Sequence, residues 1–241
     1  MARSRGNLMN KLANVCFTAA SLVICGFAAP VSASPLTVLD ASFESLPPGA
    51  YSPPASNFVA PWLFGCGLGT CGEAGILALS TAPDGAQVGY TSSAGVAGHL
   101  GSIAQDVAAI IPGATYTFSI LVGQSTTEAS LTGYRLVLGY DVTPNDPSTN
   151  VQFANVLFTA PGDIPAEGDF LLATITAVAP NNATGDVTIA FGSGSFAMWD
   201  EASLAVTTTP LPAALPLFAG GLGLIGLLAR RRKQKLAAQL H

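Results

Sequence analysis

Apolar and polar side chains alternate along several stretches in the middle of the chain. Four stretches carry large apolar side chains at every second position: Tyr116, Phe118, Ile120 and Val122; Tyr134, Leu136, Leu138 and Tyr140; Val187, Ile189 and Phe191; Leu204 and Val206. A period of two places these side chains on one face of a β-strand. Each stretch therefore predicts a strand with one face in a hydrophobic core.

Further strands are predicted at residues 36–44, 151–158 and 170–178. Short segments rich in Pro, Gly, Asn and Asp punctuate the chain and predict turns. These turns fall at residues 112–113, 144–147, 161–163 and 180–182. Many short strands with such turns, and little helical periodicity, predict an all-β fold: a single jelly-roll β-sandwich.

The predicted β-sandwich domain covers residues 34–206, which is enough chain for a core of its own. Residues 45–61 are rich in Pro and Ser and predict a long surface loop. Residues 141–150 form a polar turn segment, and residues 207–210 predict a short linker to the C-terminal segment.

Charge is distributed unevenly along the chain. Residues 34–209 contain all 14 acidic residues and one base, Arg135, so this part carries a net charge of −13. Residues 1–33 carry +3 and residues 210–241 carry +5, with no acidic residue in either. A domain this acidic repels phosphates, so the composition excludes nucleic acid as a partner.

The N-terminus predicts a secretory signal peptide over residues 1–33. A basic start is followed by the apolar run 15–29 and by Val31-Ser32-Ala33, a small-x-small pattern that predicts cleavage after Ala33. A lipoprotein signal at Cys25 is one alternative, which Ile24 disfavours. An uncleaved membrane anchor is the other, and the apolar run is shorter than the ~20 residues that a span needs.

The C-terminus predicts a transmembrane helix over residues 211–229, which contain no charge. The basic tail at residues 230–241 follows it and should stay cytoplasmic by the positive-inside rule. The acidic middle then lies on the far side of the inner membrane, in agreement with the signal peptide.

The last part of the chain resembles a PEP-CTERM sorting signal. Its three parts are a proline motif, a glycine-rich apolar helix and an arginine cluster: Pro210, Leu211 and Pro212; residues 211–229; Arg230, Arg231 and Arg232. Thr209-Pro210-Leu211-Pro212 stands in place of the literal Pro-Glu-Pro. The resemblance implies a Gram-negative bacterium, recognition by an exosortase at the inner membrane, and transfer to the cell surface or beyond, often alongside exopolysaccharide. The alternative is a permanent tail anchor.

Cys66 and Cys71 are the two cysteines expected in the mature chain. An oxidising compartment favours a local disulfide between them. Such a small loop would mainly be stiffened by it. A zinc site is the alternative, but His99 is the only histidine of the middle region.

Carboxylates stand at both ends of the predicted domain. Asp40-Ala41-Ser42-Phe43-Glu44 opens it and Trp199-Asp200-Glu201 closes it. This pairing resembles the galactose-binding-like jelly rolls of carbohydrate-binding modules, which hold a structural Ca²⁺. The resemblance implies Glu44 and Asp200 as side-chain ligands, with Asp40 and Glu201 as lesser candidates. The alternative is that these carboxylates face solvent at strand ends.

A series of short motifs resembles bacterial secreted domains related to the hapalindole-type (Stig) cyclases. In chain order the motifs are Ala41-Ser42-Phe43-Glu44, Ala82-Pro83-Asp84-Gly85, Ile103-Ala104-Gln105-Asp106, residues 112–117 and Trp199-Asp200-Glu201. The resemblance implies the jelly roll and bound calcium. No catalytic acid of the cyclases has a counterpart here, so it implies no activity.

The sequence predicts a non-enzymatic, exported cell-surface or matrix protein that binds polysaccharide. It contains neither a Gly-x-Ser-x-Gly elbow nor a His-Glu-x-x-His helix. Trp62, Phe64 and Tyr90 are candidates for stacking on sugars, although core packing explains them equally well. The alternative function is a secreted carbohydrate-active or cyclase-like enzyme that uses paired carboxylates.

Overall fold

The computed structural model describes residues 32–52, 57–65, 72–94, 99–143 and 149–208. The predicted sorting signal, transmembrane helix, basic tail and Cys66–Cys71 disulfide lie outside these residues, as does nearly all of the predicted signal peptide. Within the described residues, no helix has the length and apolar character needed to cross a membrane.

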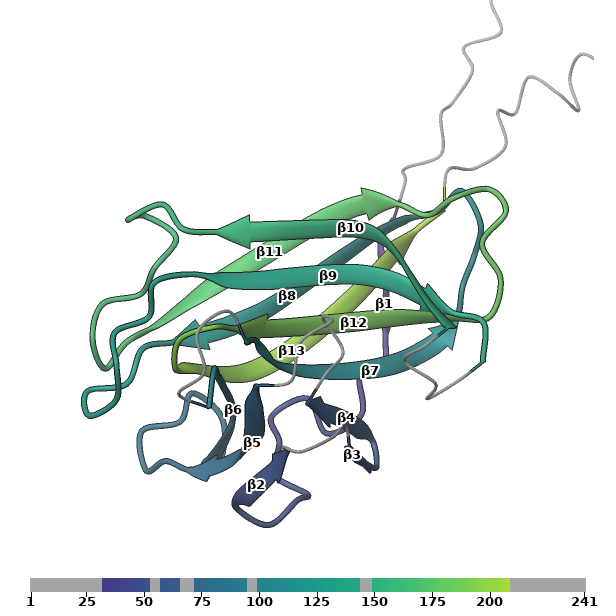
Figure 1. Ribbon diagram of the computed structural model, residues 1–241. Helices are drawn as coiled ribbons and strands as arrows, with labels where there is room; N and C mark the ends of the chain where they lie inside the picture. Colours follow the sequence, from purple (N-terminus) through teal and green to yellow (C-terminus); the bar gives the residue numbers. More distant parts are fainter. Residues whose placement is uncertain (1–31, 53–56, 66–71, 95–98, 144–148, 209–241) are drawn as a thin grey trace, which may run out of the picture. The chain divides into compact units, whose positions relative to one another are not determined.

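Two antiparallel β-sheets form a sandwich (Figure 1). The first sheet contains β1 (Ser34–Leu36), β2 (Gly49–Ser52), β5 (Glu73–Ala78), β6 (Gln87–Ser92), β8 (Thr115–Gly123), β11 (Phe170–Val178) and β13 (Ala197–Thr207). The second sheet contains β3 (Asn57–Val59), β4 (Trp62–Gly65), β7 (Gly101–Ala109), β9 (Tyr134–Asp141), β10 (Asn150–Phe158) and β12 (Asp186–Ser193). The predicted all-β sandwich is thus confirmed.

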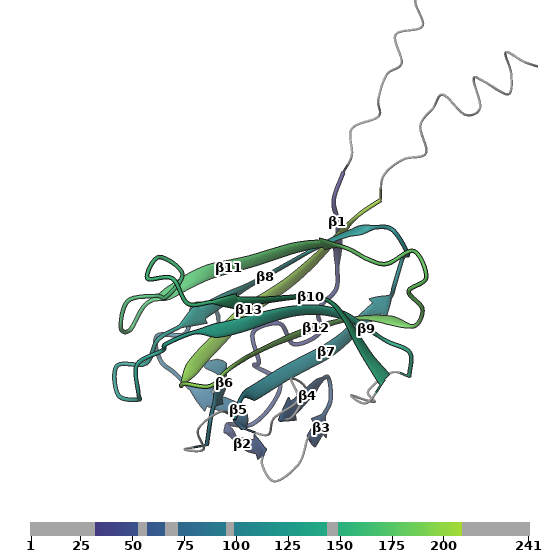
Figure 2. The ribbon, with the colours of Figure 1, turned by 45° about the horizontal axis from the view of Figure 1, so that its top comes forward.

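The strand order is that of a jelly roll. β6 pairs with β13, β7 with β12, β8 with β11, and β9 with β10, all antiparallel. The run β6–β9 is therefore matched strand by strand with the returning run β10–β13, and the pairs alternate between the two sheets. Figure 2 shows the remaining strands at the margins: β5 and β2 extend the first sheet, β4 and β3 the second, and β1 lies beside β13.

The core lies between the sheets and contains the side chains whose alternation predicted the strands. Tyr116, Phe118, Ile120 and Val122 of β8 are fully buried, while the side chains that alternate with them are partly exposed: Thr115, Thr117, Ser119 and Leu121. Burial of one large apolar side chain contributes about 2–3 kcal/mol. The predicted strands at residues 151–158 and 170–178 are also confirmed, as β10 and β11.

The strand predicted at residues 36–44 is wrong beyond its first residue. β1 ends at Leu36, and a turn follows in which Asp40 and Phe43 have φ values of 48° and 62°. The Phe43 N–H donates to the Asp40 carbonyl oxygen at 3.0 Å, which closes the turn. Phe43 is fully buried and stacks on Trp62 with 4.9 Å between ring centroids. Burial of this ring in the core outweighs the cost of a left-handed backbone.

The surface loop predicted at residues 45–61 is wrong in part, since β2 and β3 lie within it. Both are short edge strands, and each exists through pairing with a partner, β5 and β4 respectively. Four strands from β4 to β7 were also not predicted. On β6, Gly89 stands opposite Ile76, and a Cβ there would lie 3.0 Å from the Phe43 ring. The Phe43 ring thus fills the space beside Gly89. A large side chain at that position would have made the alternation of this strand visible in the sequence.

Candidate functional site: a pocket with an aromatic pair, and a carboxylate cluster

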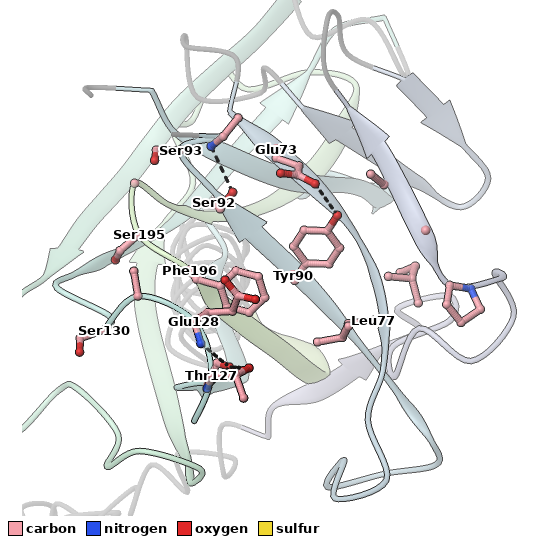
Figure 3. A pocket seen from close by; sticks show the side chains of 18 of the residues that line it. Glu73, Leu77, Tyr90, Ser92, Ser93, Thr127, Glu128, Ser130, Ser195 and Phe196 are labelled. Carbon is pink, nitrogen blue, oxygen red and sulfur yellow. Dashed lines mark hydrogen bonds between the residues drawn. The ribbon is translucent and has the colours of Figure 1, made fainter. Parts of the chain in front are cut away.

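A pocket of about 1010 Å³ lies over β5 and β6, on the outer face of the first sheet. The side chains of Ile76 and Ala74 point into the core, so the alternate side chains, including that of Glu73, point into the pocket. The loop between β8 and β9, the turn between β12 and β13, residues 48–50 at the start of β2 and residues 93–94 after β6 complete its lining. Figure 3 shows Tyr90 and Leu77 of the sheet in the same view as Thr127 and Glu128 of the loop.

An aromatic pair lies in this pocket. The rings of Tyr90 and Phe196 stack at 5.5 Å between centroids and 13° between planes. The Tyr90 hydroxyl donates to Oε1 of Glu73 at 2.8 Å, as the dashed line in Figure 3 shows. Burial, followed by the hydrogen bond and negative charge of Glu73, raises the pKa of Tyr90. The phenol therefore stays protonated and its orientation is fixed.

Hydrogen bonds hold the rim of the pocket in place. The Ser125 hydroxyl oxygen accepts from the N–H groups of Thr127 and Glu128, at 3.1 and 3.2 Å. The Ser195 hydroxyl oxygen accepts from the N–H of Thr132 at 3.0 Å, which ties the β8–β9 loop to the β12–β13 turn. Such side-chain bonds to backbone N–H groups order loops that lack ladder pairing.

Of the three aromatic residues proposed for sugar stacking, only Tyr90 lines the pocket. Trp62 and Phe64 are fully buried, and the Trp62 indole N–H donates to the Asp40 carbonyl oxygen at 3.0 Å. Core packing, the alternative explanation, therefore holds for these two. Sequence reasoning missed Phe196 and Glu73. The one available signal was a large aromatic residue directly after the glycine-serine turn 192–195.

A second candidate site is a cluster of carboxylates at the other end of the β5–β6 hairpin. Asp200 is fully buried; its Oδ2 accepts from the Asp84 N–H at 3.0 Å and its Oδ1 from the Glu201 N–H at 2.8 Å. Oε1 of Glu44 accepts from the N–H groups of Ala86 and Gln87, at 2.8 and 2.7 Å. Two carboxylates from opposite ends of the domain therefore hold the same turn.

Backbone irregularities aim these side chains. The pairing of β13 with β8 shifts register between Asp200 and Ser203, and Glu201 has a φ of 50°. This bulge lets Trp199 pack in the core while the adjacent Asp200 contacts the β5–β6 turn. Gly85 in that turn has a φ of 73°, and a Cβ there would lie 2.3 Å from Oε1 of Glu44. The turn therefore requires glycine for both its conformation and its space.

Burial dominates the electrostatics of the cluster. Burial raises the pKa of the Asp200 carboxyl from 3.8 to about 6, although the N–H groups of Asp84 and Glu201 oppose the shift. Oδ1 of Asp40 accepts from the Ser45 N–H at 2.9 Å, while Oδ2 of Asp40 is buried with no hydrogen-bond partner. An unpaired buried acceptor costs about 1–3 kcal/mol. A cation nearby would compensate both the buried Asp200 carboxyl and the unpaired Asp40 oxygen.

The predicted calcium ligands Asp40, Glu44 and Asp200 all belong to this region of the fold. The turn bearing Asp40 and the bulge bearing Asp200 are joined by a hydrogen bond from the Ala202 N–H to the Ala41 carbonyl oxygen, 3.1 Å long. Among the described residues, however, no three His, Cys, Asp or Glu side chains are grouped to hold one metal ion. Calcium takes six to eight oxygens, so backbone carbonyls would have to supply most of them. Calcium binding stays a prediction.

No family model matches the sequence, and neither does any curated protein. Solved structures do match the fold. The enzymatically active domain of tailspike protein 4 from bacteriophage CBA120 has a TM-score of 0.47 and 8% identity, over 71% of this chain and 21% of that one. The CBM22-1-GH10 modules of Clostridium thermocellum xylanase 10B, complexed with xylohexaose, have a TM-score of 0.41 and 14% identity, over 64% of this chain and 27% of that one. TmCBM61 in complex with β-1,4-galactotriose has a TM-score of 0.39 and 14% identity, over 71% of this chain and 98% of that one.

This chain thus spans about a fifth and a quarter of the first two structures, and nearly all of the third. At these TM-scores and identities, no ligand or activity carries over to it. Its own strand pairing defines its class: an antiparallel jelly-roll β-sandwich.

Proposed function

We propose that this chain is an exported, non-enzymatic cell-surface or extracellular-matrix protein that binds polysaccharide in the β5–β6 pocket. The observation that carries the proposal is the stacked pair of Tyr90 and Phe196 in a pocket that also contains serine and threonine hydroxyls and two carboxylates among its small apolar lining residues. An apolar aromatic surface surrounded by fixed polar groups suits a sugar, which has an apolar C–H face and a polar edge.

Each part of the pocket has a role in this proposal. The C–H face of a sugar ring packs against the aromatic pair, and the hydroxyls along its edge bond to the polar lining. Glu73 is held by Tyr90 through one oxygen, so its carboxylate accepts from a sugar hydroxyl in a fixed position. The serine and threonine hydroxyls of the rim both donate and accept, as sugar hydroxyls do.

The test of glycan binding is an array followed by titration calorimetry on the purified protein. Phe196→Ala removes half of the aromatic pair and should weaken binding about tenfold, equivalent to about 1.4 kcal/mol. Phe58→Ala is the matched control, because Phe58 is exposed and does not line the pocket. A blank array, or equal loss in both variants, would rule out this pocket as the binding site.

The export route is proposed from the sequence. The basic, apolar ends and the acidic middle support passage through the inner membrane, and the C-terminal pattern supports recognition by an exosortase there. Alkaline phosphatase fused after Ala33 should be active outside the cytoplasm. Replacement of Arg230, Arg231 and Arg232 by alanine should then block processing of the C-terminal segment. A fusion that remains in the cytoplasm would contradict the whole route.

A structural calcium ion is part of the proposal. Asp200 and Glu44 would bind it, with Asp40 as a further ligand, and the ion would supply a positive charge beside the buried Asp200 carboxylate. Its role would be to stabilise the β5–β6 turn rather than to take part in chemistry.

A secreted carbohydrate-active enzyme is the second candidate, because two carboxylates, Glu73 and Glu128, line the same pocket. Glycoside hydrolysis uses such a pair. Incubation with each array-positive glycan, followed by detection of new reducing ends, tests it. Release that Glu73→Gln and Glu128→Gln both abolish would favour the enzyme over the binding protein.

A further inference from the structure

We propose that the β5–β6 pocket selects glycans by charge: it accepts neutral and amine-bearing sugars and excludes uronates and sulfated sugars. This inference rests on the proposed glycan binding and names the substrate class of the same site. It concerns the charged groups of the pocket, and these come from two separate elements of the fold.

The pocket lining is negatively charged. Glu73 on β5 and the exposed Glu128 on the β8–β9 loop both line it. No lysine, arginine or histidine is present among the described residues that line it. A bound carboxylate or sulfate would therefore face two like charges with no cation to compensate. An ammonium group would face two carboxylates of opposite charge.

Basic side chains are scarce in the rest of the domain. Between residues 34 and 209 the sequence has only two basic side chains, Arg135 and His99. Arg135 lies on β9 of the second sheet, where it donates to Oδ1 of Asn155 at 3.3 Å, and neither residue lines the pocket. With a net charge of −13 on this part of the chain, repulsion also acts at long range, within a Debye length of about 8–10 Å at 0.1–0.15 M salt.

The strongest hydroxyl donor of the pocket is already used. The Tyr90 phenol donates to Glu73, so it does not offer its proton to an incoming carboxylate. The polar group that this bond holds in place is the Glu73 carboxylate, which is a hydrogen-bond acceptor. Neutral sugars provide hydroxyl donors for such a group and amino sugars provide charged ones, whereas a uronate brings a further acceptor.

Three hexasaccharides with one β-1,4-linked backbone test the inference by calorimetry: the glucose hexamer, its C6-oxidised uronate form and the glucosamine hexamer. In 20 mM salt the uronate should bind at least tenfold more weakly than the neutral form. In 500 mM salt this gap should narrow, because screening weakens the repulsion. The glucosamine hexamer should bind at least as tightly as the neutral one, and should lose affinity as salt is added.

Matched glutamate variants locate the effect. Glu128→Gln should raise uronate affinity and lower glucosamine affinity, each several-fold, with little change for the neutral hexamer. Glu167→Gln is the control, because it changes the net charge equally at an exposed residue outside the pocket lining. Uronate binding equal to neutral binding, or equal effects of the two variants, would overturn the charge selection alone. Failure of all three hexamers would overturn it too, whereas a blank glycan array would remove the proposed function itself.

Discussion

The carboxylate of Asp200 on the last strand accepts a hydrogen bond from the backbone N–H of Asp84, 116 positions earlier in the chain, at 3.0 Å. Glu44 binds the same turn through the N–H groups of Ala86 and Gln87. The turn connects β5 to β6, and the opposite end of this hairpin carries Glu73 and the polar end of the pocket. The carboxylate cluster therefore anchors the hairpin on which the proposed binding site is built.

Without a bound cation, the stability of the domain should fall as the Asp200 carboxyl loses its proton. Its pKa is raised to about 6 in the folded protein, against an ordinary value of 3.8. The stabilising contribution is therefore complete below about pH 4 and is lost as pH rises through 6, by about 3 kcal/mol in total. Urea unfolding in EDTA at pH 4, 5, 6 and 7 measures it as the difference between wild type and Asp200→Asn. A constant difference across these pH values would contradict the prediction.

Calcium should reverse this pH dependence if Asp200 and Glu44 bind it. A cation beside Asp200 favours the ionised carboxylate, so 1 mM CaCl₂ should raise the melting temperature at pH 7 and chelation should lower it. At a hundredfold excess over the dissociation constant the gain is about 2.7 kcal/mol. Asp200→Asn and Glu44→Gln should lose the calcium response, and Glu167→Gln should keep it. A melting curve of the wild type that calcium and chelator leave unchanged would exclude the site.

Gly85→Ala should destabilise the domain by about 2 kcal/mol or more, since a left-handed backbone alone costs an L-residue roughly 1–2 kcal/mol. The added Cβ would also lie 2.3 Å from Oε1 of Glu44 and would displace that carboxylate. Gly162→Ala is the control, because a Cβ there meets nothing within 4 Å. Urea unfolding measures both. In a double-mutant cycle, Gly85→Ala should destabilise the Glu44→Ala variant less than it destabilises the wild type, because the clash with Glu44 is gone and only the backbone cost remains. Strictly additive effects of the two substitutions would show that no clash exists.

Phe43→Ala should cost about 3–5 kcal/mol, as expected for removal of a fully buried aromatic side chain. Phe43 stacks on Trp62 and also contacts the edge of Phe191, so its loss leaves a cavity between the two sheets. Phe58→Ala at the exposed Phe58 should change the free energy of unfolding by no more than about 0.5 kcal/mol. Chemical denaturation of the two variants measures these changes in the free energy of unfolding. Equal, small effects would mean that the turn carrying Asp40 and Glu44 does not depend on this ring.

The strands with regular alternation could be predicted because their burial repeats every two residues. In β8, every second side chain is large and fully buried, so the sequence contains the whole signal. The strands from β4 to β7 carry glycine and small residues where partners approach closely. Gly89, for example, faces a ring that belongs to residue 43, and no local pattern reveals this.

The candidate site likewise has one part that the sequence could suggest and another that only the fold brings together. Tyr90 could be suggested from its residue type, but its partners Phe196 and Glu73 lie on other strands, and β13 lies beside β6 only because the jelly roll closes. The same closure brings Asp200 to Asp84. Trp62 and Phe64 have the residue types of a sugar platform and are buried instead.

The sequence by itself determined the all-β class, the faces of the regular strands and the acidity of the middle of the chain, because each of these is a sum over local positions or charges. Only the tertiary structure decided which aromatic rings are buried, which carboxylates converge on one turn, and where the pocket lies. Those outcomes depend on contacts between residues more than 100 positions apart, such as Asp84 and Asp200, which are fixed by packing over the whole sandwich rather than by any local segment.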